Sequence, residues 1–138
     1  MQAAAQAGKG GHRFDPSILR EYDIRGTVGK TLAETDCYFV GRAFGTILAG
    51  EGKKTAAVGR DGRESSPAFA RELIRGLNES GIDVKDIGLG PTPMAYFAMK
   101  SLGMDAALIV TGSHGAPSYN GIKMAMKDRP FYGAGVQE

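Results

Sequence analysis

The chain has 138 residues, the size of one ordinary domain, and its 42% hydrophobic and 23% charged residues are typical of a globular protein. A net charge of +2 is too small to indicate nucleic acid or an anionic membrane as a partner. The single cysteine, Cys37, excludes an intramolecular disulfide, and a reduced, cytoplasmic setting is expected.

The first part of the chain predicts a tail followed by an extended segment. Residues 1–13, rich in Ala, Gln and Gly, predict a flexible N-terminal tail, and residues 14–138 predict one domain. Residues 14–30 predict a short extended segment that ends in a turn. The Arg25 guanidinium could hold a phosphate through two parallel hydrogen bonds, with Tyr22 adding a hydroxyl donor. A solvated or salt-bridged Arg25 is the alternative that these residues alone favour.

The first helix is predicted over residues 31–49. Thr31 and Glu34 have the spacing of a capping box, and Gly50 is expected to end the helix. Apolar residues recur at helical spacing and give one buried face, formed by Cys37, Val40, Phe44, Ile47 and Leu48. Cys37 is therefore interpreted as a small core residue and not as a nucleophile.

Strands and helices then alternate. A strand over 55–59 precedes a helix that Ser66-Pro67 opens, with Phe69, Leu73 and Leu77 buried. A strand over 84–89 precedes a helix that Thr92-Pro93 opens, whose inward residues are Ala95, Ala98, Met99 and Leu102. Strands follow over 106–110 and, antiparallel, over 122–126. This order predicts an α/β fold of three α/β/α layers with a mixed, mostly parallel sheet.

Candidate functional residues follow several of these strands. In parallel sheets, ligands gather at the carboxyl ends of the strands. Arg60, Arg63, the Gly90 loop and Ser113 all come directly after strands. We therefore expect them at one edge of the sheet.

The stretch from Leu108 to Lys123 carries the chemistry. Thr111-Gly112 ends the strand and presents Ser113 and His114 on a loop rich in turn residues, namely Gly115, Pro117, Ser118, Asn120 and Gly121. A hydroxyl beside an imidazole at a strand end is a candidate for covalent catalysis. A surface loop in which both are only turn residues remains the alternative. Lys123 falls on the opposite face of the last strand from Ile122, Met124 and Met126.

Three other sites are disfavoured by spacing or composition. Gly29-Lys30-Thr31 lacks the earlier glycine of a phosphate-binding P-loop. The stretch from Thr111 to Gly115 is one residue short of the Gly-x-Ser-x-Gly nucleophile elbow of hydrolases. Two histidines and one cysteine make a zinc site improbable.

Four motifs resemble those of the phosphomannomutase/phosphoglucomutase (α-D-phosphohexomutase) family. Thr111-Gly112-Ser113-His114 and Tyr119-Asn120-Gly121-Ile122-Lys123 together resemble its phosphoserine loop. The others are Tyr22-Asp23-Ile24-Arg25-Gly26, Gly59-Arg60-Asp61-Gly62-Arg63 and Gly90-Pro91-Thr92-Pro93. The resemblance runs from about Phe14 to the end of the chain, which corresponds to the first of the four domains usual in such enzymes.

The resemblance implies a site and a reaction. Ser113 would carry a phosphoryl group that moves between the 1- and 6-positions of a hexose phosphate, mannose or glucose phosphate among them. His114 and Lys123 would assist proton transfer and charge stabilisation, and Tyr22 and Arg25 would contact the phosphate. Magnesium would bind Ser113 through its phosphoryl group, with its other ligands from another domain, and glucose 1,6-bisphosphate would be the activator. The implied partners are the sugar phosphate and the remaining mutase domains or a partner chain, without nucleic acid or membrane.

Two departures from the family pattern leave two hypotheses. Gly115-Ala116 stands where the family usually has Asn-Pro, which predicts a more flexible loop, and the chain has no cluster of aspartates for magnesium. Under the first hypothesis, this is a mutase domain that works only with the other domains. Under the second, it is a truncated or degenerate domain that binds phosphate or a partner protein without turnover. Under both, the isolated chain is expected to show negligible mutase turnover.

Overall fold

The computed structural model describes residues 24–112 and 118–127, so the predicted tail over residues 1–13 lies outside the described residues. Strands and helices alternate along most of the described chain. In order they are β1 (Ile24–Thr27), α2 (Glu34–Gly50), β2 (Thr55–Arg60), α3 (Ser66–Glu79), β3 (Asp83–Leu89), α4 (Thr92–Ser101), β4 (Ala106–Val110) and β5 (Tyr119–Met126).

The strands form one sheet in the order β1-β5-β4-β2-β3. β2 pairs in parallel with β3 and β4, whereas β5 pairs antiparallel with β4 and β1. Among the described strands, only β5 therefore runs against the others. The predicted mixed, mostly parallel sheet and the antiparallel last strand are both confirmed.

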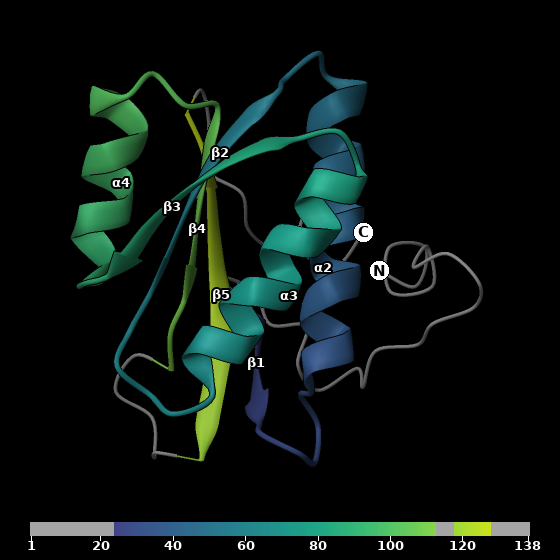
Figure 1. The fold of residues 1–138 in the computed structure, drawn as a ribbon, viewed down its shortest axis with the longest axis vertical. Coiled ribbons are helices and arrows are strands. Elements are labelled where there is room, and N and C mark those ends of the chain that lie inside the picture. Colours follow the sequence, from purple (N-terminus) through teal and green to yellow (C-terminus); the bar gives the residue numbers. More distant parts are fainter. Residues whose placement is uncertain (1–23, 113–117, 128–138) are drawn as a thin grey trace.

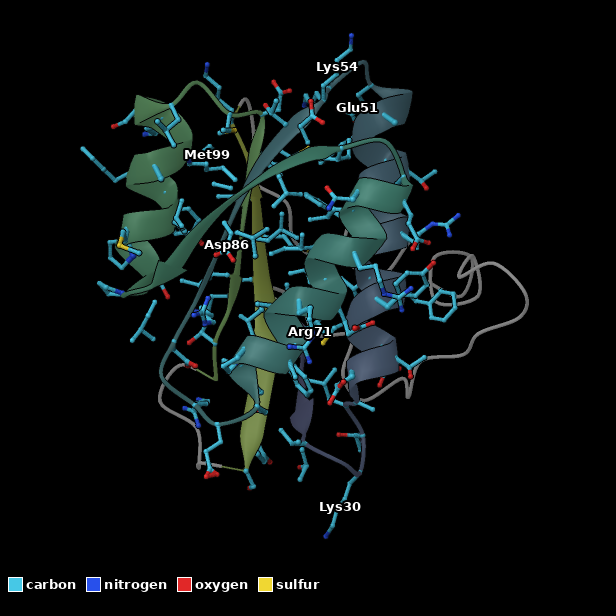
Figure 2. The ribbon with its side chains drawn as sticks, in the orientation of Figure 1. Lys30, Glu51, Lys54, Arg71, Asp86 and Met99 are labelled. Atoms are coloured by element: carbon cyan, nitrogen blue, oxygen red, sulfur yellow. The ribbon has the colours of Figure 1, made fainter. Side chains whose placement is uncertain are left out.

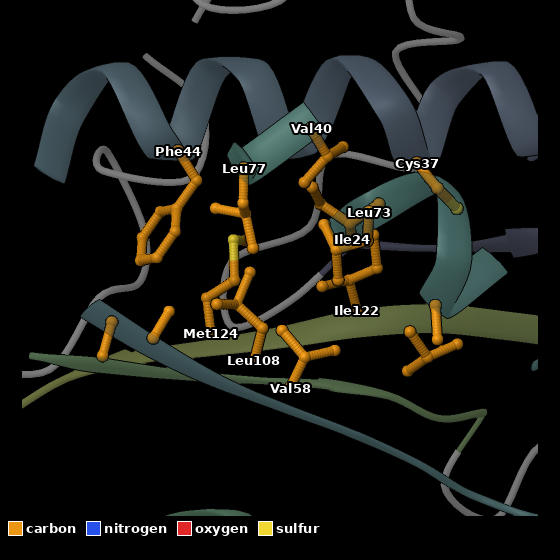
Figure 3. Packing of buried hydrophobic residues seen from close by; sticks show 14 of the residues in the cluster. Ile24, Cys37, Val40, Phe44, Val58, Leu73, Leu77, Leu108, Ile122 and Met124 are labelled. Atoms are coloured by element: carbon orange, nitrogen blue, oxygen red, sulfur yellow. The ribbon is translucent and has the colours of Figure 1, made fainter. Parts of the chain in front are cut away.

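Helices cover both faces of the sheet, with α2 and α3 on one face and α4 on the other (Figure 1). The larger core lies under α2 and α3, where Phe44, Leu77 and Leu108 are buried together (Figure 3). A smaller core joins Ala95 and Met99 of α4 to β4. All five residues of β4 are buried because helices pack on both of its faces, which explains its unbroken apolar sequence.

The α2 and α3 helices approach each other closely at two glycines. A methyl group on Gly76 would collide with the Tyr38 carbonyl oxygen and would lie 2.9 Å from the Arg42 nitrogen. Gly41 faces the backbone of α3 in the same way, 2.9 Å from the Leu77 nitrogen. The crossing of the two helices thus depends on the absence of side chains at this point.

The beginning of α2 differs from the sequence-based expectation. Ala33 precedes the helix, and the Asp36 carboxylate accepts a hydrogen bond from its N–H at 2.8 Å. The Thr31 hydroxyl instead accepts from the Thr27 N–H at 2.9 Å, so the predicted capping role of Thr31 is wrong. The helix also runs through Gly50, and the chain turns at Gly52, whose φ is +76°.

The predicted inward face of α4 is partly wrong. Ala95 and Met99 are buried, but Leu102 is 52% exposed because the helix ends at Ser101 and the chain turns at Gly103. Phe97, on the same helix, is 72% exposed.

Two strands are longer or more regular than expected. β5 begins at Tyr119, so Asn120 and Gly121 belong to the strand and not to the predicted turn-rich loop. The segment before Lys30 supplies a true strand, β1, which pairs with β5 at Ile24 and Ile122. β1 and the first residues of β5 therefore become strands by pairing with each other.

The edge strand β3 carries a bulge. Val58 is opposite Asp86 and Gly59 is opposite Gly88, so Ile87 has no counterpart on β2. Gly88 has a φ of +78°, which suits glycine. The exposed Lys85 and Asp86 precede this bulge.

Candidate functional site

The carboxyl ends of β2 and β4 lie side by side. Arg60 is opposite Val110 in the parallel register, and the Asp61 N–H donates to the Val110 carbonyl oxygen at 2.9 Å. The Gly90 N–H donates to the Arg60 carbonyl oxygen at 3.0 Å. The sequence-based expectation that the segments after these strands meet at one edge is therefore correct for their described parts.

The Asp61 carboxylate is the centre of this edge. It accepts hydrogen bonds from the Thr111 hydroxyl at 2.9 Å and from the Gly112 N–H at 3.1 Å, at the start of the predicted nucleophile loop. It also accepts from the Ser66 hydroxyl at 2.6 Å and from the N–H and Nε of Arg63 at 3.2 and 3.1 Å. These five residues are called the Asp61 cluster below.

The acidity of Asp61 reflects these contacts. Burial by itself raises the pKa of the carboxyl, but the hydrogen bonds from Ser66, the Arg63 N–H, Thr111 and the Gly112 N–H outweigh it and hold the pKa below its ordinary value. Asp61 is therefore an anion at neutral pH whose two oxygens are both occupied by donors. This arrangement suits a fixed acceptor and not a general base.

The Arg63 guanidinium lies against Gly112. A methyl group on Gly112 would lie 2.5 Å from Cζ and 2.8 Å from Nη2 of Arg63, and would collide with Nε. Only glycine therefore permits this close approach without movement of the arginine. A cation is thus held against the backbone one residue before Ser113.

The other flank of the loop is also fixed. The Asn120 side chain, which is fully buried, donates to the hydroxyls of Ser65 at 2.7 Å and Ser66 at 3.0 Å. Its own oxygen accepts from the Gly121 N–H at 2.8 Å. The Thr111 N–H donates to the Gly121 carbonyl oxygen at 2.9 Å. Both flanks of residues 113–117 are therefore bonded to each other and to the beginning of α3.

The predicted catalytic residues are only partly described. Tyr22, Ser113 and His114 lie outside the described residues. The backbone of Arg25 lies in β1 opposite Gly121, and its side chain is outside the described part. Lys123 is half-buried in β5 opposite Ile109, while Ile122, Met124 and Met126 are buried on the other face, as the alternation predicts.

Two residues from the sequence analysis have other surroundings. Arg60 pairs with Asp86 at 3.7 Å, beside a hollow of about 310 Å³ that α3 also lines, and Figure 2 labels Asp86 and Arg71 of this hollow. Cys37 is fully buried, and its burial, reinforced by the carboxylates of Asp36 and other acidic residues, raises the pKa of its thiol far above the usual range. The interpretation of Cys37 as a core residue is confirmed.

The described part of the chain contains neither a cluster of potential metal ligands nor a helix that could span a membrane. Residues 24–112 and 118–127 contain no group of three His, Cys, Asp or Glu side chains that could hold a metal ion. No described helix is both long and apolar enough to span a bilayer.

Sequence reasoning missed the roles of Asp61, Ser66 and Asn120. Asp61-Gly62 has the composition of a turn, and Asn120 has that of a loop, so neither predicts a buried network. The available signal was a carboxylate placed directly after a buried strand and followed by the consecutive hydroxyls of Ser65 and Ser66.

Comparisons with known proteins agree on one group. The model of the family described as phosphoglucomutase/phosphomannomutase, alpha/beta/alpha domain I, matches residues 16–133. The phosphomannomutase/phosphoglucomutase of Pseudomonas aeruginosa is 46% identical over 110 residues, which are 80% of this chain and 24% of that protein. The phosphoglucomutase of Neisseria gonorrhoeae is 44% identical over 121 residues, which are 88% of this chain and 26% of that protein.

A solved structure adds a comparison in three dimensions. The crystal structure of a phosphoglucomutase/phosphomannomutase family protein from Burkholderia thailandensis superposes with a TM-score of 0.85 at 41% identity. The match covers 90% of this chain and 29% of that one. The chain thus spans about a quarter of the length of the curated relatives named above.

Proposed function

Because the chain belongs to the phosphoglucomutase/phosphomannomutase family and matches its α/β/α domain I, we propose that it is the nucleophile-bearing domain of a phosphohexomutase. The observation that carries this proposal is the Asp61 cluster, which fixes the two residues directly before Ser113. Covalent catalysis requires a nucleophile held in one geometry, and the cluster provides a rigid base for it.

The proposed reaction consists of two phosphoryl transfers. A hydroxyl oxygen of a hexose monophosphate attacks the phosphorus of phospho-Ser113, the proton of that hydroxyl passes to a base, the serine O–P bond breaks, and the serine oxygen takes a proton. The Ser113 hydroxyl then attacks the other phosphorus of the resulting bisphosphate and gives its proton to a base, while the sugar O–P bond breaks and the sugar oxygen takes a proton. The substrate is thereby isomerised and the phosphoserine is restored.

Cationic side chains supply the charge stabilisation in this proposal. Phosphoryl transfer depends mainly on positioning and electrostatics, and a phosphoserine carries about −1.5 to −2 charge. Lys123 and Arg25 are proposed to balance that charge, with Tyr22 as a further donor and His114 in proton transfer. The backbones of Arg25 and Lys123 lie on the two paired strands β1 and β5.

Magnesium has a restricted place in this proposal. The described residues offer no cluster for it, and both oxygens of Asp61 already accept hydrogen bonds. Magnesium would therefore bind through the phosphoryl group of Ser113 and ligands from another domain, and it would neutralise phosphate charge there.

Gly115-Ala116 favours a second candidate function, a domain that binds phosphate or a partner protein without turnover. Neither residue carries the φ restraint that a proline supplies in the Asn-Pro usual in the family, and that restraint would favour a fixed nucleophile. The two functions differ in whether Ser113 accepts a phosphoryl group.

The test is phosphopeptide mapping of the purified chain after incubation with magnesium and glucose 1,6-bisphosphate. We expect phosphate on Ser113 in the wild type and none in Ser113→Ala, while Ser118→Ala, which changes an exposed serine just after residues 113–117, keeps it. Wild-type chain without phosphate would contradict phosphotransfer by this chain and favour the binding function.

Turnover of glucose 1-phosphate by the chain alone is expected to be negligible with magnesium and the bisphosphate present. Turnover that disappears in Ser113→Ala would contradict this expectation.

A further inference from the structure

We infer that Asp61 is a positioning residue. It acts on the nucleophile Ser113 indirectly, through Thr111, Gly112 and Arg63. The inference rests on the proposed function, because it assigns Asp61 a role in the transfer proposed for Ser113. Asp61 itself is not proposed to touch the sugar or the phosphoryl group.

The direction of the hydrogen bonds supports this role. Thr111 and Gly112 follow β4, where backbone pairing with β2 ends, and both donate to the same oxygen, Oδ2 of Asp61. One carboxylate oxygen therefore fixes the hydroxyl of Thr111 and the peptide of Gly112 at once. The Thr111–Gly112 peptide, one residue ahead of Ser113, is thereby held by the residue that follows β2.

The other carboxylate oxygen fixes Asp61 in turn. Oδ1 accepts from the Ser66 hydroxyl and the Arg63 N–H, at the entry to α3. Ser66 is fully buried and its hydroxyl also accepts from Asn120, which lies on the far flank of the loop. A single carboxylate thus connects the start of the loop to α3 and, through Ser66, to the start of β5.

Asp61 also orients the Arg63 cation. The Arg63 Nε donates to Oδ2 of Asp61 at 3.1 Å, and the guanidinium lies against Gly112 with only 15% of the side chain exposed. A guanidinium that moved away would leave the Gly112 backbone without this neighbour. The loss of Asp61 should therefore release both the loop flank and the cation beside it.

A purely structural role is the alternative, and the chain contains a control for it. At the other end of the same two strands, the Asp105 carboxylate accepts from the N–H groups of Lys54 at 2.8 Å and Thr55 at 3.2 Å, and from the Thr55 hydroxyl at 3.2 Å. We call Asp105, Lys54 and Thr55 the Asp105 cluster. It has the same chemistry but lies at the opposite end of β2 and β4 from Thr111 and Gly112, the end that Lys54 marks in Figure 2.

The experiment compares Asp61→Asn with Asp105→Asn in the 138-residue chain. The initial rate of Ser113 phosphorylation by glucose 1,6-bisphosphate with magnesium is measured against bisphosphate concentration, at a temperature where each variant is folded. We expect Asp61→Asn to lower the saturating rate about tenfold or more without changing the half-saturating concentration. Asp105→Asn should stay within about twofold of the wild type.

Thr111→Val provides a second, milder variant, because it removes one donor to Asp61 and keeps the size of the side chain. Its rate should lie between those of the wild type and Asp61→Asn. Equal rates for Asp61→Asn and Asp105→Asn, or a change confined to the half-saturating concentration, would overturn the inference.

Amide hydrogen exchange separates this inference from the proposed function. If the wild type takes no phosphate, the proposed function fails for this chain, and the exchange of the Gly112 amide decides the positioning role. Faster exchange at Gly112 in Asp61→Asn but not in Asp105→Asn supports the role. Unchanged exchange at Gly112 in Asp61→Asn overturns it.

Discussion

The Asp61 and Asp105 clusters lie at opposite ends of the β2 and β4 pair, and in both a carboxylate connects the two strands. Each is a carboxylate that accepts hydrogen bonds across the two strands, and in each the pKa of the carboxyl is lowered. At Asp105 the largest cause is the hydrogen bond from the Lys54 N–H, a backbone group on an exposed residue. At Asp61 the donors include the buried side chains of Ser66 and Thr111.

The difference lies in what each carboxylate connects. Asp105 joins the beginning of β4 to the beginning of β2 and stops there. Asp61 joins the end of β4 to a helix entry, and the buried Ser66 continues the connection to Asn120 of β5. The first arrangement aligns strands, whereas the second immobilises both flanks of a loop. Buried polar networks with every member satisfied are rigid in this way.

The largest expected effect comes from a variant that lies outside both clusters and weakens the packing of α3 on α2. Gly76→Ala places a methyl group against the backbone of α2. The backbone can make room for it only if the two helices move apart. Overpacking typically costs about 1–3 kcal/mol, a collision with backbone belongs at the upper end of that range, and the higher helix propensity of Ala returns up to about 1 kcal/mol. We expect a net loss of about 2 kcal/mol in the free energy of unfolding, measured by urea denaturation.

Gly50→Ala is the matched control, because a methyl group there would meet nothing within 4 Å. It should leave stability unchanged or raise it by a few tenths of a kcal/mol. A stable Gly76→Ala variant would show that the helix crossing tolerates a side chain.

The next largest effect is a difference in stability between variants of the two clusters. Asp61→Ala leaves the buried hydroxyls of Ser66 and Thr111 without this acceptor, and we expect a loss of about 1.5 kcal/mol. Asp105→Ala leaves mainly backbone groups that water can reach at Lys54, and we expect about 0.5 kcal/mol. Denaturation of both variants under one condition measures the difference, and equal losses would contradict the distinction between the clusters.

The smallest effect is expected from acid. Both carboxyls have folded-state pKa values below the ordinary value, so their stabilisation is complete above the unfolded-state pKa of about 4. It is lost as the pH falls through the folded-state pKa. A protonated carboxyl keeps one acceptor oxygen, so protonation should cost less than replacement by Ala. The loss of stability below about pH 4 should be shallower in Asp61→Asn and in Asp105→Asn than in the wild type.

The sequence predicted the elements whose identity is decided locally. The buried stripe of Phe69, Leu73 and Leu77 predicts α3, and the apolar run over 106–110 coincides with β4. The spacing of apolar residues reflects whether one or both faces of a helix or strand are buried. This spacing can be read from the sequence of the segment alone. The three-layer α/β/α architecture followed from the order of these elements.

The sequence did not predict features that depend on distant partners. The sequence predicts only an extended segment over residues 14–30 and a loop at Asn120 and Gly121, and both are strand because β1 pairs with β5. Likewise, Asn120 has no local reason to be buried, and its partners Ser65 and Ser66 lie far away in the sequence. Thr31 has capping spacing, but its hydroxyl is taken by the Thr27 N–H.

The bulge in β3 has a consequence for the behaviour of the protein in concentrated solution. An exposed edge strand offers unpaired N–H and C=O groups on which another chain can add a strand, and this is a route to aggregation. Three features of β3 interrupt this row of unpaired groups. Ile87 is unmatched on β2, Gly88 has a positive φ, and Lys85 and Asp86 carry exposed charges. We therefore expect β3 to add a strand from another chain less readily than a regular edge strand would.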